Sequence, residues 1–273
     1  MVFSMFGGGK GGPQLRPMER KDMGGVLRII AQHDEDDFEE AREELREELA
    51  GMFVLADGNK VVGVTGGHVD PHTDDVVWLS WTYVDVERQG QGLGTTMFKA
   101  MTDMLRSDGV RKLFINTSDY MDDGEDMYAP ARAFYEKMGA TLEIKLPDYH
   151  AAGEARWTYG LDLVRPPRRS DHPGGGAVRF IDIEELDESE GGWGLVWEEA
   201  EGAPDPSLVD PALKHWIDQA HKRKARILFA AVPSDLCANL NQAFGETGFA
   251  HHGRLLDYFA PNIHQELGSL HLR

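Results

Sequence analysis

A run of alternating glycines, Gln89-Gly-Gln-Gly-Leu-Gly94, is the feature of this sequence best suited to chemistry. Hydrophobic periods predict a strand directly before it and an amphipathic helix directly after it. Glycines let a backbone approach a ligand closely, and the amides of a helix N-terminus attract anions. The run lacks the third glycine of the dinucleotide pattern, since Thr95 stands there, and no Lys-Ser or Lys-Thr pair follows it. It therefore predicts a diphosphate site, with a plain glycine-rich turn as the alternative.

Alternating and helical hydrophobic periods predict the elements that would position this loop. Strands are expected at 14–18, 52–56, 60–66, 76–86, 112–117, 141–146 and 155–163, and helices at 19–48, 95–108 and 131–138. The first helix should break near Gly24-Gly25 and again around Asp34–Asp37. Mostly antiparallel strands thus precede a strand–loop–helix–strand unit, which predicts an α/β class (α+β, mixed sheet) with one central sheet.

A second motif, Ala131-Arg-Ala-Phe-Tyr-Glu-Lys-Met-Gly-Ala140, follows one strand after the glycine loop. The two motifs resemble those of the GNAT superfamily of N-acetyltransferases. Residues 83–94 look like the family's acetyl-CoA signature, (R/Q)-x-x-G-x-(G/A), and residues 131–140 look like its A-x-x-(L/F)-Y-x-K-x-G-F helix. The defined positions of the signature hold Gln89, Gly92 and Gly94. The resemblance covers about residues 14–163 and implies a GNAT fold.

The resemblance implies a transferase that moves an acetyl group from acetyl-CoA, its cosubstrate, to an amine by direct attack on the thioester. The acceptor would be a primary amine on a small molecule or a protein. Backbone groups of Val84 and Val86 would hold the pantetheine arm. The pyrophosphate would be bound by backbone amides of Gln89, Gly90, Gln91, Gly92, Leu93, Gly94 and Thr95. Tyr135 matches the family tyrosine that donates its hydroxyl hydrogen to the departing CoA thiolate. A phenol of pKa ~10 can serve a thiolate of pKa ~8.5 in this way.

The general base departs from the family pattern. Many members carry a glutamate on the fourth strand, where this sequence has Trp81 beside Ser80. Either water takes the proton or another side chain does. The candidates in the turn before that strand are His68, Asp70 and His72. A polar hairpin is the alternative explanation for each of them. Tyr128 also replaces the asparagine that the family places seven residues before its tyrosine.

An acidic insertion, Asp119–Asp126, separates the strand 112–117 from the helix that carries Tyr135. In the GNAT fold this connection lies close to the thioester, so we expect it to attract a cationic amine acceptor. The candidate substrate contacts are Trp81, Asp119, Asp122 and Asp123. A solvated acidic loop is the alternative.

The segment after a Pro- and Gly-rich stretch repeats the first segment in outline. Residues 226–232 parallel 112–117, residues 211–224 parallel 95–108, residues 243–249 parallel 134–140, and Trp193–Trp197 echo Trp78–Trp81. The chemistry is not repeated, because prolines fall at the glycine-loop position 204–209 and Phe244 stands at the tyrosine position. We expect a truncated, degenerate GNAT-like half-domain that completes or covers the first domain or supports a homodimer. Its histidines lack metal-ligand spacing, so no metal site is expected.

The amino-acid composition limits the functions that the protein can have. The chain has 273 residues, 28 Lys+Arg against 47 Asp+Glu, a net charge of −19 and one cysteine. This excludes a disulfide framework and disfavours nucleic-acid binding, which needs basic residues. No apolar run is long enough for a membrane helix, and a cytoplasmic location is expected.

The chain is expected to divide into a flexible arm (1–13), a catalytic acetyl-CoA-binding domain (14–165), a linker (166–176) and the degenerate domain (177–273). A non-catalytic acyl-CoA-binding or regulatory module is the alternative function, because the strand glutamate is missing.

Overall fold

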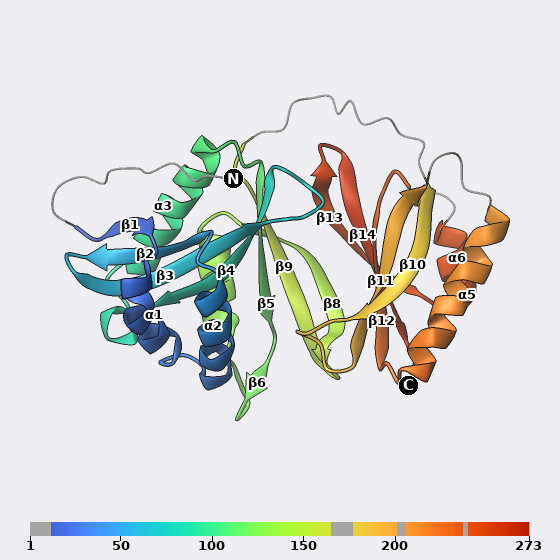
Figure 1. Ribbon diagram of the computed structural model, residues 1–273, viewed down its shortest axis with the longest axis horizontal. Coiled ribbons are helices and arrows are strands. Elements are labelled where there is room, and N and C mark those ends of the chain that lie inside the picture. Colours follow the sequence, from blue (N-terminus) through green and yellow to red (C-terminus); the bar gives the residue numbers. More distant parts are fainter. Residues whose placement is uncertain (1–11, 165–176, 201–205, 237–239, 273) are drawn as a thin grey trace. The chain divides into compact units, whose positions relative to one another are not determined.

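The computed structural model describes residues 12–164, 177–200, 206–236 and 240–272 (Figure 1). The chain forms two compact units: residues 1–115 with 161–165, and residues 116–160 with 166–273. A seven-stranded sheet has the order β1-β2-β3-β4-β5-β9-β8, and a five-stranded sheet has the order β10-β11-β12-β14-β13. Among the described residues, no helix is both long and apolar enough to cross a bilayer.

The first unit packs helices on both faces of its sheet. Its elements are β1 (Gln14–Pro17), η1 (Arg20–Asp22), α1 (Met23–Ile30), α2 (Glu35–Glu47), β2 (Met52–Asp57), β3 (Lys60–Val69), β4 (Val76–Val84), η2 (Val86–Arg88), α3 (Leu93–Ser107) and the start of β5 (Lys112–Ser118). One core lies beneath α1 and α2, where Ile30 and Leu45 meet Val54 and Val64. On the other face, Met97 of α3 packs on the strands.

The strand β4 has two irregular features that matter for the site. It pairs in parallel with β5 only from Val76↔Lys112 to Trp78↔Phe114. Its antiparallel pairing with β3 shifts register between Val64 and Gly66, and Trp81 in the shifted stretch has a φ of 39°. The shift is a β-bulge, which bends a strand and re-aims its side chains.

The second unit holds a short hairpin, the helix with Tyr135 and the five-stranded sheet. Its elements are β6 (Met121–Asp122), β7 (Glu125–Asp126), α4 (Ala129–Lys137), β8 (Thr141–Ala151), most of β9 (Glu154–Asp162), β10 (Ala177–Glu185), β11 (Gly192–Ala200), α5 (Pro206–Lys222), β12 (Ile227–Pro233), α6 (Leu240–Thr247), β13 (Ala250–Ala260) and β14 (Ile263–His271). Leu213 of α5 and Ala243 of α6 pack on Leu228 and Ala230 of β12.

The predicted order of strands and helices in the first 163 residues is confirmed, with two differences, and one strand beyond residue 163 was not predicted. The helix break predicted at Gly24-Gly25 is wrong, because α1 runs through both glycines. The second predicted break, around Asp34–Asp37, lies next to the turn at 31–34 that separates α1 from α2. The acidic insertion contains the hairpin β6–β7, and the strand β10 was not predicted. Most of the predicted arm, the predicted linker and residues 204–205 lie outside the described residues.

Candidate active site

The glycine loop leads from η2 into α3, as its sequence predicts. Gly90 and Gly92 adopt left-handed φ values of 74° and 77°, and Gly92 caps α3. A left-handed backbone costs an L-residue roughly 1–2 kcal/mol, so glycine suits both positions. The first N–H groups of α3, at Leu93 to Thr95, have no partner within the helix. The loop can therefore present several amides and the positive end of a helix dipole to an anion.

A buried carboxylate, Asp85, anchors the chain just before the loop. Its side chain is fully buried and lies 3.0 Å from Arg28 Nη2 and 3.5 Å from Lys60 Nζ. It also accepts a hydrogen bond from the Glu87 amide. Burial raises the pKa of Asp85, but the hydrogen bond and charge of Arg28 outweigh it and hold the pKa below its ordinary value. Sequence reasoning missed this residue, whose only signal is an aspartate directly after an apolar strand.

Asp85→Asn should destabilise the protein by about 2 kcal/mol at neutral pH, because it leaves a partly exposed arginine without its buried partner. A lowered folded-state pKa means that the stabilisation exists above the unfolded pKa of ~3.9 and is lost as pH falls through the folded value. Urea unfolding at pH 7 and pH 3 should show a difference from the wild type that shrinks at the lower pH. An equal difference at both pH values would contradict this role for Asp85.

The far edge of β4 carries the backbone groups expected to hold pantetheine. The Asp85 amide donates to the Val62 carbonyl of β3, so by alternation Val84 and Val86 face the opposite edge. There, His33 Nε2 donates to the Val84 carbonyl at 2.9 Å, and the Val86 amide donates to Gln32 Oε1 at 3.0 Å. Two side chains from the turn after α1 therefore form hydrogen bonds with the backbone groups that the resemblance assigns to pantetheine.

The position expected to hold the general base is Trp81, in the bulge of β4. Its indole Nε1 donates to Glu44 Oε2 of α2 at 2.8 Å. Two residues later, the Tyr83 hydroxyl donates to Asp37 Oδ2 of the same helix. The strand itself supplies no carboxylate here, but α2 supplies one beside each aromatic ring. Sequence reasoning missed these carboxylates, which are far from β4 along the chain.

Of the residues proposed as bases in the turn before β4, Asp70 is buried. It accepts hydrogen bonds from Trp78 Nε1 at 3.1 Å and from the His72 amide at 2.9 Å. These contacts close the β3–β4 hairpin, which favours the structural alternative for Asp70. His68 is exposed near the end of β3.

Tyr135 lies in α4 of the second unit. Its side chain is buried, and its ring makes an edge contact with Phe134. Burial raises the pKa of the Tyr135 phenol to about 12. The hydroxyl therefore stays protonated at neutral pH and can donate a hydrogen bond, which is the role that the resemblance implies.

The acidic insertion is partly neutralised within the second unit. Asp119 accepts from the Ala155 amide and lies 2.7 Å from Lys145 Nζ, while Asp126 pairs with Arg132. Burial raises the pKa of Asp119, but the hydrogen bonds from Lys145 and from the Ala155 amide outweigh burial and hold the pKa below its ordinary value. The acids exposed on the β6–β7 hairpin are Asp122, Asp123 and Glu125. The contacts of Asp119 therefore fix the start of the insertion, and the negative charge exposed to solvent is carried by the three hairpin acids.

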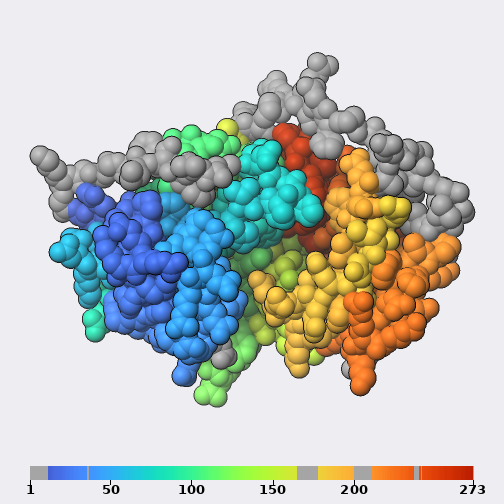
Figure 2. All heavy atoms as spheres, viewed as in Figure 1, coloured from blue at the N-terminus to red at the C-terminus, as the bar shows by residue number. Residues whose placement is uncertain are grey.

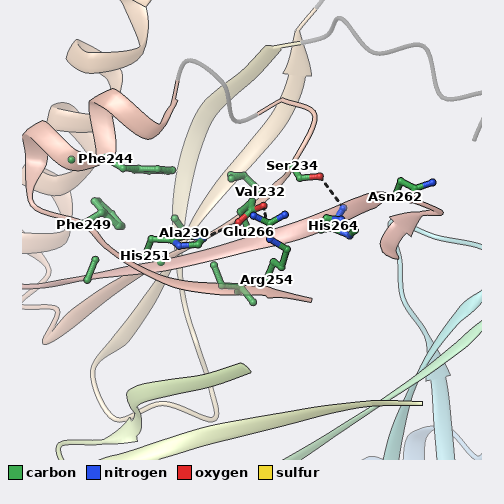
Figure 3. A pocket seen from close by; sticks show the side chains of 14 residues that line it. Ala230, Val232, Ser234, Phe244, Phe249, His251, Arg254, Asn262, His264 and Glu266 are labelled. Atoms are coloured by element: carbon green, nitrogen blue, oxygen red, sulfur yellow. Dashed lines mark hydrogen bonds and ion pairs between the residues drawn. The ribbon is translucent and has the colours of Figure 1, made fainter. Parts of the chain in front are cut away.

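A cavity of about 770 Å³ lies in the second unit, between β12, α6, β13 and β14 (Figure 3). Phe244 and Phe249 form its apolar end. At its polar end, Glu266 lies 2.8 Å from His251 and 3.2 Å from Arg254. Sequence analysis placed Phe244 at the position matching Tyr135 but did not foresee the cavity around it.

Comparisons with known proteins agree with this fold. Residues 15–140 match the acetyltransferase (GNAT) family. A solved structure described as a GNAT-family acetyltransferase from Desulfovibrio desulfuricans is 25% identical, covers 56% of this chain and 99% of its own, and has a TM-score of 0.50. No curated protein matches the sequence.

Two further solved structures resemble the chain. The ribosomal-protein-S18-alanine N-acetyltransferase of Escherichia coli is 18% identical, with 58% of this chain and 98% of its own covered and a TM-score of 0.47. An acetyltransferase from Salmonella typhimurium, solved with acetyl-CoA, is 17% identical, with 59% and 99% covered and a TM-score of 0.45.

The mixed sheet thus matches the fold of a solved acetyltransferase. More particularly, residues 15–140 match the acetyltransferase (GNAT) family, and the predicted enzyme class, an N-acetyltransferase, is confirmed.

Proposed function

We propose that the chain transfers an acetyl group from acetyl-CoA to a primary amine by direct attack on the thioester. The glycine loop carries this proposal, because Gly90 and Gly92 open the N-terminus of α3 to a diphosphate. Loop amides bind the pyrophosphate and the edge of β4 binds pantetheine. Tyr135, protonated and buried, donates to the leaving thiolate. We assign these roles to the loop residues 89–95, to Val84 and Val86, and to Tyr135.

We also propose that residues 177–273 are a degenerate repeat of five neighbouring strands of the seven-stranded sheet. In support, β10-β11-β12-β14-β13 has the same order as β3-β4-β5-β9-β8, with a three-residue parallel pairing at the same place. The hairpins β8–β9 and β13–β14 also have the same turn geometry. Asp148 and Asp257 both have a φ of 52° and accept from the amides of Gly153 and Asn262, at 2.6 and 2.7 Å.

In this repeat a side chain connects β11 and β12 beyond the three residue pairs at which the two strands are hydrogen-bonded. The Trp197 indole donates to the Ala231 carbonyl of β12 at 2.7 Å. The bridge supports a second repeat that does not bind acyl-CoA. The domain limits proposed from the sequence, 14–165 and 177–273, follow this duplication. A homodimer stays a prediction, as does the cytoplasmic location.

We propose a cationic amine as the acceptor. Asp122, Asp123 and Glu125 are exposed on the β6–β7 hairpin of the second unit, and charges there favour a cation by long-range attraction. Replacing all three by the matching amides should then raise acceptor KM and weaken its salt dependence.

An acceptor screen that follows thiol release from acetyl-CoA tests the function. Calorimetry should show one acetyl-CoA site per chain, and at least one amine should release CoA. Binding of acetyl-CoA without thiol release from any amine would favour the non-catalytic module, which the tryptophan at the base position supports. The absence of acetyl-CoA binding would contradict both.

Gln32→Ala should strengthen acetyl-CoA binding, because pantetheine must displace the Gln32 side chain from the Val86 amide. One hydrogen bond is worth about 0.5–1.5 kcal/mol, so the Kd should fall about 2- to 10-fold. Calorimetry on this variant and on His33→Ala checks the expectation. Weaker binding by both variants would mean that the turn supports the cofactor instead of competing with it.

A further inference from the structure

The exposed carboxylate of Glu44 lies where the chain otherwise lacks a base. The resemblance places the base at Trp81, and the Trp81 indole nitrogen lies 2.8 Å from Glu44 Oε2. Glu44 belongs to α2, which lies at the surface of the molecule (Figure 2). An acceptor can therefore reach this carboxylate from solvent.

Both partners of this hydrogen bond are held by the core of the first unit. Ala41 and Leu45 are fully buried and fix the rotation of α2, which leaves Glu44 at the margin of the buried face. The Trp81 ring packs against the same core, and its strand is bulged there. Thr82, the next residue, bonds its hydroxyl to Thr65 of β3 at 2.9 Å. The indole N–H thus points in a fixed direction and orients the carboxylate.

The other carboxylates near β4 are engaged differently. Asp70 is buried and accepts from Trp78 and from the backbone of its own turn. Asp85 is buried against Arg28. Asp37 accepts the hydroxyl hydrogen of Tyr83. Glu44 differs from Asp70 and Asp85 because its carboxylate is open to solvent while one oxygen is oriented by the strand.

We propose that Glu44 is the general base of the reaction, a proposal that rests on the acetyl transfer proposed above. The Glu44 carboxylate takes a proton from the acceptor nitrogen. The nitrogen lone pair forms the new C–N bond at the thioester carbonyl carbon. The C–S bond then breaks, and its electron pair leaves with sulfur, which takes the hydroxyl proton that Tyr135 donates in the proposed function and becomes the CoA thiol. The proton that the nitrogen loses as the amide forms returns to the phenol through solvent. Trp81 is a positioning residue, since it acts through Glu44.

The test compares Glu44→Gln with Glu43→Gln, which removes the same charge from an exposed position of the same helix. Glu44→Gln should lower kcat about 10²-fold with an alkylamine that is protonated at the assay pH, and leave the Kd for acetyl-CoA unchanged. The loss should be at least about 10-fold smaller with an amine that is already neutral, because less of its reaction depends on a base. Glu43→Gln should match the wild type with both amines.

Trp81→Phe keeps the ring and removes the indole donor, so it should lower kcat several-fold. Its effect should largely vanish in the Glu44→Gln background, because the two residues act as one unit. Equal losses with both amines, or a larger selective loss in Asp37→Asn, would overturn the assignment. A wild-type chain that acetylates no amine would instead defeat the proposed function.

Discussion

Gly92→Val should abolish measurable acetyl-CoA binding. Gly92 has a φ of 77°, and a Cβ at this position would meet no atom within 4 Å, so the side chain would project into open space above the helix N-terminus. There it would cover the amides that the proposed site offers to a pyrophosphate. A hydrogen bond to a charged group contributes about 1.5–3 kcal/mol, so losing two raises the Kd by about 10²-fold or more. Calorimetry with acetyl-CoA measures this.

The matched control is Gly109→Val. Gly109 lies just beyond the other end of α3, with a φ of 82° and equally open surroundings. The substitution imposes the same backbone strain, so its cost in folding free energy should equal that of Gly92→Val. Its acetyl-CoA affinity should stay at the wild-type value. Similar affinity losses in both variants would show that strain, and not the position of Gly92 in the loop, is responsible.

Tyr135→Phe should lower kcat about 10²-fold and change the Kd for acetyl-CoA less than threefold. In the proposed mechanism the hydroxyl is needed when sulfur becomes negative, so its removal should raise the barrier without weakening ground-state binding. Steady-state assays with saturating acetyl-CoA, together with calorimetry, separate the two quantities. Because the pKa of Tyr135 is raised to about 12, this group should cause no decline of kcat in the wild type below about pH 11.

Tyr159→Phe serves as the control for loss of a buried hydroxyl. The pKa of Tyr159 is also raised to about 12, by burial and by its hydrogen bond to Glu136 at 3.1 Å. Its removal should cost about 1 kcal/mol of stability and leave kcat within threefold of the wild type. If both variants lose turnover equally, Tyr135 contributes through packing alone.

Local patterns in the sequence predicted much of the first unit. The glycines at 90 and 92 needed only their immediate neighbours to be recognised, and the structure gives them the expected left-handed backbone and the helix after them. The helix that carries Tyr135 was found in the same way. Its buried position and raised pKa could not be read from the motif, because both depend on the strands packed around it.

The parts that were missed depend on contacts between distant segments. Arg28 reaches Asp85 across 57 residues, and Glu44 reaches Trp81 across 37. No period or motif links such pairs, because tertiary packing alone brings them together. The strand β10 was missed for another reason. A bulge between Phe180 and Asp182 shifts its register with β11, so its apolar residues do not keep one alternating period.

The strand β8 packs against residues that lie beyond residue 165, so its burial depends on them. The Tyr149 ring meets Phe229 of β12 with centroids 5.0 Å apart, Arg226 donates to the Asp148 carbonyl at 2.8 Å, and the Leu256 amide donates to Glu143. A family domain cut out after β9 would lose these partners and expose Tyr149 to water. A chain that ends after β9 should therefore be more prone to aggregate, because β8 is the last strand of its sheet and would present an uncovered apolar ring at an open edge.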